Sequence, residues 1–113
     1  MRSDRERLLD VIEAIERIEK YSQKSKNVFD TDELVQNWII HHLFIVGEAV
    51  TRVSDEIQEK YYEVPWSKII GMRNILVHGY FEIDKEVVWS VVEKDLPELK
   101  KNIQKILTET LKQ

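Results

Sequence analysis

One short segment of the sequence gathers side chains that could act on a phosphodiester. Arg73, Asn74, His78 and Tyr80 are separated mainly by aliphatic residues. An arginine can hold a phosphate with its planar set of N–H donors and stabilise the charge that builds in a transition state. An imidazole, with a reference pKa of about 6.5, can exchange a proton near neutral pH. With RNA, this pair would allow the 2′-oxygen to attack the adjoining phosphorus and leave a 2′,3′-cyclic phosphate.

The spacing of the arginine and the histidine leaves two arrangements open. Residues five apart on an unbroken α-helix differ by about 140° around its axis, so Arg73 and His78 would diverge. Gly79 suits the position that ends a helix. Either the last turn unwinds and His78 swings back, or each Arg73 pairs with His78 of a second copy. The second arrangement predicts an active site shared by a dimer, and Asn74 could orient either group.

A second candidate group lies in the apolar stretch from Trp38 to Val50. This stretch is apolar on nearly every side, which is typical of a helix at the centre of a bundle or in an oligomer interface. Gly47 would permit a close approach of another helix. Glu48 is an acid in apolar surroundings, where an unpaired carboxylate is costly. We therefore expect Glu48 to support the site, with Arg73 as a possible partner, rather than to carry the chemistry.

Capping patterns predict where the helices that carry these residues begin. Ser3 and Glu6 have the spacing of a capping box, and an apolar stripe with helical spacing follows them. Asp30 and Glu33 repeat the capping pattern before the apolar stretch. These patterns predict two helices, the second of them running to about residue 53.

Further signals refine the prediction along the chain. Phe29 is placed to pack on Leu34 as a hydrophobic staple at the start of the second helix. A short helical turn is expected after Ser54, and a longer helix after Pro65, ending near His78.

The last part of the chain predicts one more apolar stripe. Asp84 is the expected cap of this segment. Pro97, together with the pair Asp95 and Glu98, indicates either a new helix start or a single kinked helix.

Composition limits the class of protein. The chain has 113 residues, no cysteine, only five glycines and prolines together, and a net charge of −4. Disulfide scaffolds and thiol enzymes are excluded, and no metal or cofactor site is expected. No strand pattern or membrane span is predicted, and we expect a cytoplasmic protein. The sequence predicts one domain over residues 1–113, an all-α antiparallel bundle of four to five helices that forms a homodimer.

The sequence resembles the HepT-like branch of the HEPN ribonucleases, which are small all-α toxins. The resemblance rests on the Arg-x4-His-x-Tyr pattern from Arg73 to Tyr80 and on Gly47-Glu48-Ala49. The elements Val88-Trp89 and Asp95-Leu96-Pro97 extend it over nearly the whole chain. It implies metal-independent RNA cleavage by Arg73 and His78 in a homodimer. It also implies a cognate nucleotidyltransferase antitoxin as partner, with Tyr80 as the acceptor of adenylylation.

Other interpretations compete with a nuclease. A non-catalytic helical module could use the same motif to bind a substrate or dock on a nucleotidyltransferase, and a purely structural dimer is a third candidate. His41 and His42 are adjacent on the predicted helix, so they cannot form a two-histidine metal face, and we expect them to pack in the core or an interface. We likewise expect core packing of the large aromatic residues: Trp38, Trp66, Trp89, Tyr61 and Tyr62.

Overall fold

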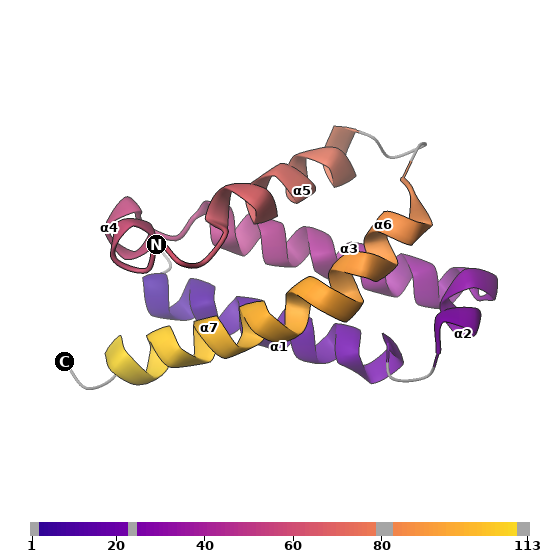
Figure 1. Ribbon diagram of the computed structural model, residues 1–113, viewed down its shortest axis with the longest axis horizontal. Coiled ribbons are helices and arrows are strands. Elements are labelled where there is room, and N and C mark those ends of the chain that lie inside the picture. Colours follow the sequence, from indigo (N-terminus) through magenta and orange to yellow (C-terminus); the bar gives the residue numbers. More distant parts are fainter. Residues whose placement is uncertain (1–2, 23–24, 79–82, 111–113) are drawn as a thin grey trace.

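The computed structural model describes residues 3–22, 25–78 and 83–110. In these residues the chain forms helices that run back and forth along one long axis (Figure 1). The long elements are α1 (Asp4–Ser22), α3 (Glu33–Thr51), α5 (Trp66–His78) and a continuous final helix. Two short helices, α2 (Lys26–Thr31) and α4 (Asp55–Lys60), occupy the connections. The predicted all-α bundle is confirmed.

The first helix begins as its capping pattern predicts. The backbone N–H of Glu6 donates to Ser3 Oγ at 3.2 Å, and the N–H of Ser3 donates to the Glu6 carboxylate at 3.3 Å. The apolar stripe of α1 then lies against α3 and α7, where Val11 and Ile18 are fully buried. Burial of this stripe is what stabilises the helix, since propensity alone contributes little.

The start of α3 differs from the prediction. Asp32, not Asp30, caps it, because the Asp32 carboxylate accepts the N–H groups of Leu34 and Val35. The preceding residues form α2, so Asp30 lies inside that short helix. The predicted hydrophobic staple is also wrong, since Phe29 is buried against Trp89 while Leu34 is 80% exposed.

The final helix consists of α6 (Lys85–Ser90), the π-helical segment η2 (Val91–Asp95) and α7 (Leu96–Thr110). Asp84 caps its start, as predicted. The N–H of Leu96 donates to the carbonyl of Val91, five residues earlier, and Pro97 follows with no N–H of its own. Of the two alternatives, a single helix with a local irregularity is therefore the correct one.

The core lies where the long helices face one another. Its largest fully buried side chains come from α1, α2, α3 and α7. Trp66, Trp89 and Tyr61 are buried, which confirms the expectation for them, and Trp38 is partly buried. Tyr62 is exposed, so core packing is wrong for that residue. None of the described helices is long and apolar enough to cross a bilayer.

Candidate functional site

A close crossing of α3 and α5 positions the candidate arginine. A Cβ atom added to Gly47 would lie 2.8 Å from Arg73 Cγ and 3.2 Å from Arg73 Cα, and still closer to Arg73 Cβ. Only a glycine leaves room for the backbone of α5 at this point. The expectation that Gly47 allows a close helix approach is confirmed, and the residue in contact with it is Arg73.

The guanidinium of Arg73 is held by a carboxylate and an amide. Its Nε donates to Glu48 Oε1 at 2.5 Å, Nη2 forms an ion pair with the same oxygen, and Nη1 donates to Asn74 Oδ1 at 2.9 Å. Side-chain exposure is 29% for Arg73 and 28% for Glu48, so the pair is partly desolvated. This geometry confirms the cationic partner expected for Glu48.

The contacts fix the arginine without using all of its donors. Nη1 and Nη2 each carry two hydrogens, and the bonds to Asn74 and Glu48 use one on each nitrogen. N–H groups therefore remain for a ligand on this partly exposed side chain. A phosphate is the natural acceptor for such a group.

The histidine of the motif lies at the end of the same helix. α5 is α-helical from Trp66 to His78, which leaves Arg73 and His78 about 140° apart around its axis. The side chain of His78 lies outside the described residues. So do Gly79 and the candidate modification residue Tyr80.

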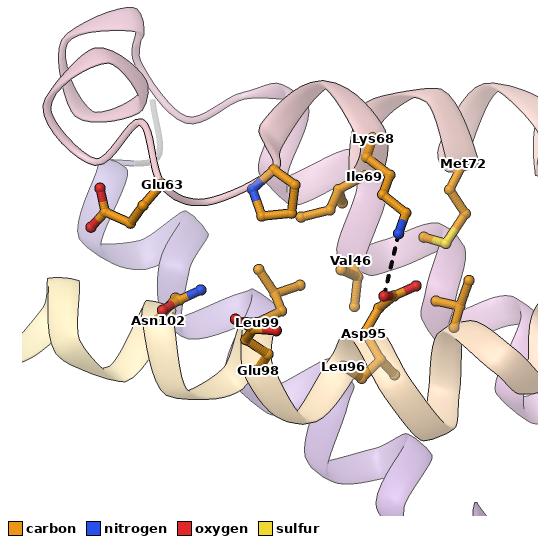
Figure 2. Close-up of a pocket in the computed structure, with 12 residues that line it drawn as sticks. Val46, Glu63, Lys68, Ile69, Met72, Asp95, Leu96, Glu98, Leu99 and Asn102 are labelled. Atoms are coloured by element: carbon orange, nitrogen blue, oxygen red, sulfur yellow. Dashed lines mark hydrogen bonds and ion pairs between the residues drawn. The ribbon is translucent and has the colours of Figure 1, made fainter.

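A hollow of about 280 Å³ opens between α5 and the helix from Val91 to Asn102 (Figure 2). Met72 and Ile69 line it, while the ion pair of Lys68 Nζ with Asp95 Oδ1, at 3.3 Å, spans it. Its remaining charged residues, Glu63 and Glu98, are acidic. An apolar hollow with an acidic surround repels phosphate, so we do not place the candidate active site there.

Two more observations concern residues away from Arg73. Lys68, the other cation on α5, is exposed and pairs with Asp95. His42 is buried, with Nδ1 2.7 Å from the carbonyl oxygen of Trp38, while His41 is exposed on the same helix. Burial lowers the pKa of His42 below the ordinary histidine value. In the described part of the chain, no group of three potential metal ligands occurs.

Sequence reasoning missed one residue beside the site. Arg52 is the C-cap residue of α3 and lies one helical turn after Glu48, with its Nε 4.0 Å from Glu48 Oε2. The i,i+4 spacing of an acid and an arginine on one helix was the available signal. The spacing does not show that Arg52 lies beside the site, because that depends on the contact between Glu48 on α3 and Arg73 on α5.

Fold and site together define a class of protein: a small all-α bundle in which one peripheral helix carries a partly exposed arginine, an asparagine and, as its last residue, a histidine. Comparison with known proteins gives the family. The model of the family described as ribonuclease HepT-like matches residues 11–106. The chain belongs to this family, which confirms the resemblance and the enzyme class it implies.

Individual relatives agree with this membership. The chain is 35% identical over 106 residues to "Probable ribonuclease HepT" of Thermococcus cleftensis, covering 93% of this chain and 96% of the relative. It is 40% identical over 100 residues to "Gamma-glutamylcyclotransferase and putative RNase MJ0434" of Methanocaldococcus jannaschii. That match covers 88% of this chain and 45% of the longer relative. No solved structure matches the chain significantly.

Proposed function

We propose that the chain is a metal-independent RNA endonuclease whose catalytic residues are Arg73 and His78. The observation that carries the proposal is the state of Arg73, which Glu48 and Asn74 hold in place while its side chain stays partly exposed. Such an arginine can receive a phosphate without reorganising, and preorganised donors are the ones that accelerate a reaction most. Relatives named as ribonucleases support RNA as the substrate.

The reaction follows from the chemistry of the two side chains. The imidazole of His78 takes the proton of a 2′-hydroxyl, and the 2′-oxygen attacks the adjoining phosphorus. The bond from phosphorus to the 5′-oxygen breaks, that oxygen takes up a proton, and a 2′,3′-cyclic phosphate remains. Arg73 contacts the phosphate and stabilises its negative charge in the transition state, while Asn74 and Glu48 position Arg73.

The divergence of Arg73 and His78 favours a site that two copies share. α5 lies at the edge of the bundle and packs mainly on α3, so its outer face is uncovered (Figure 1). Gly71 and Ile75 share that face, where a Cβ on Gly71 would contact nothing within 4 Å and Ile75 is 63% exposed. A glycine inside a helix costs about 1 kcal/mol relative to alanine, so an open glycine here suits close contact with a second α5.

The biological role in this proposal is that of a toxin neutralised by a nucleotidyltransferase antitoxin. Tyr80 is two residues beyond His78 in the sequence. Attaching a nucleotide to its hydroxyl would add bulk and negative charge close to where RNA must enter, so adenylylation would silence the nuclease. Mixing the protein with the cognate nucleotidyltransferase and ATP should add mass to the wild type and not to Tyr80→Phe.

The decisive experiment is mass analysis of RNA fragments. Wild-type protein should produce ends with a 2′,3′-cyclic phosphate in the presence of EDTA, and His78→Ala should produce none while still forming a dimer. Arg73→Lys keeps the charge but loses the planar donors, so we expect cleavage to fall strongly. Intact RNA of several types after prolonged incubation with the unmodified dimer would overturn the proposal. A docking module would instead bind the nucleotidyltransferase and cause no growth arrest for His78→Ala to relieve.

A further inference from the structure

Two arginines flank one carboxylate at the junction of α3 and α5. Glu48 Oε1 binds Arg73, and Glu48 Oε2 faces Arg52 at 4.0 Å. The two guanidinium groups therefore face different oxygens of a single carboxylate group. They come from different helices, and the Gly47 crossing fixes the distance between those helices.

Arg52 is the more available of the two cations. Its side chain is 60% exposed, and among the described residues Glu48 supplies its only ion pair, at a distance beyond that of a hydrogen bond. Asp4 also lies near this end of α3. Its two carboxylate oxygens accept hydrogen bonds from Ser54, one from the backbone N–H at 2.9 Å and one from the hydroxyl at 2.6 Å. The donors of Arg52 are therefore free for an external anion.

The charges of Arg52, Arg73 and Glu48 favour binding of a ligand that carries several phosphates in a row. These three side chains together carry a net positive charge, two guanidinium groups against one carboxylate, on a protein whose net charge is −4. A single phosphate would engage Arg73 and leave Arg52 without an acceptor. A single-stranded RNA carries a phosphate at every nucleotide, so it offers neighbouring acceptors to two arginines that share one carboxylate.

We propose that Arg52 forms a second phosphate subsite, which binds the RNA phosphate adjacent to the one held by Arg73, with Glu48 as the spacer between the two arginines. This inference rests on the proposed function, because it assigns the path of the RNA along the α3–α5 junction. Arg52 is a binding residue for the substrate and takes no part in proton transfer. Its removal therefore weakens binding of RNA and changes kcat little.

A purely structural role for Arg52 predicts a different result. An exposed ion pair contributes little to stability, and so does a cation at the end of a helix, so Arg52→Gln should fold and unfold close to the wild-type temperature. Arg17→Gln is a matched control. Arg17 is also exposed, also lies four residues after a glutamate, and pairs with that residue, Glu13, at 2.9 Å on α1.

The experiment measures fluorescence anisotropy of a labelled single-stranded RNA of mixed sequence from 50 to 200 mM KCl. All proteins carry His78→Ala so that the RNA stays intact. Adding Arg52→Gln should weaken binding about tenfold, the loss of one charge-assisted contact. The slope of log affinity against log salt should fall by about 0.7, the value for one phosphate contact on a single strand. Adding Arg17→Gln should change neither quantity.

The outcomes separate this inference from the proposed function. If wild-type protein cleaves RNA but Arg52→Gln binds it as tightly as the Arg17→Gln control does, the subsite is wrong and the nuclease proposal stands. If Arg52→Gln lowers the affinity and the salt slope but wild-type protein leaves RNA intact, the subsite stands and the nuclease proposal fails. Equal weakening by both substitutions, or no RNA binding by any of the proteins, overturns the subsite.

Discussion

The carboxylate of Glu48 has two opposing effects on Arg73. It orients the guanidinium through a charge-assisted bond, and it also places a negative charge beside a proposed phosphate site. Glu48→Gln keeps a hydrogen-bond acceptor but removes the charge, and neutral hydrogen bonds are about half as strong. We expect KM for RNA to fall, because repulsion of phosphate decreases, and kcat to fall, because Arg73 is held less firmly. Steady-state kinetics on a defined RNA measures both, and a rise in KM with unchanged kcat would contradict this role.

His42 gives the fold a predictable response to acid. Burial lowers the pKa of His42 in the folded protein, so the unfolded chain takes up a proton at a higher pH than the folded protein does. The unfolded state therefore gains protons first as the pH falls through about 6.5, and the free energy of unfolding decreases. We expect the wild-type melting temperature to drop between pH 7.5 and pH 5.5 by more than that of His42→Asn.

The asparagine variant is chosen because its amide can donate to the carbonyl of Trp38, as Nδ1 of His42 can. His41→Asn is the control, since His41 is exposed on the same helix and its replacement should leave most of the acid response in place. An identical drop in melting temperature for wild type and His42→Asn would show that burial of His42 is not its source.

The site depends on the close crossing of α3 and α5. Substitutions at two glycines, Gly47 and Gly71, test that crossing. A methyl group on Gly47 would collide with the backbone and side chain of Arg73, so Gly47→Ala should push the helices apart and cost about 1 to 3 kcal/mol. A methyl group on Gly71 meets open space, and Gly71→Ala should stabilise the isolated subunit by about 0.5 to 1 kcal/mol. Urea denaturation, at dilutions where sedimentation shows a monomer, measures both, and similar effects of the two substitutions would contradict the close crossing.

At the scale of elements, the sequence predicted helices better than their local joints. The apolar stripes and the caps at Ser3 and Asp84 were read correctly, because periodic burial and capping are properties of neighbouring residues. The start of α3 was misplaced because Asp30 and Asp32 are both acceptable caps locally. A tertiary contact, in which the side-chain amide of Gln36 donates to the carbonyl of Phe29 at 2.8 Å, accompanies the arrangement that includes α2.

The candidate site was predictable to a similar degree. The sequence predicts that Glu48 needs a cationic partner and offers Arg73 as one candidate, and the structure has this pair. The position of Arg52 was not anticipated, since nothing in the spacing shows that one carboxylate lies between two helices. Motif residues within one helix can be read from the sequence, whereas a charge network between helices depends on how those helices pack.

At the scale of the whole molecule, the proposal requires two copies, and Ile75 tests this requirement. Ile75→Glu places a charge on the uncovered face of α5 without disturbing the core, since Ile75 is 63% exposed. We expect the dimer to dissociate and cleavage to fall together, because each Arg73 would lose the His78 of the other copy. Analytical ultracentrifugation and cleavage assays measure the two effects. Val87→Glu is the control, since Val87 is exposed on α6, and a fully active monomer of Ile75→Glu would overturn the shared site.

The attachment of α5 mainly to α3 has a consequence for how the molecule opens. A helix with one principal neighbour can detach locally while the other three long helices stay packed, so its amide hydrogens should exchange with solvent before those of α1 and α3. A second copy seated on its outer face would close that route. Slow exchange of the α5 amide hydrogens would then show that the dimer has formed. The contact between copies that completes the site would also keep α5 folded.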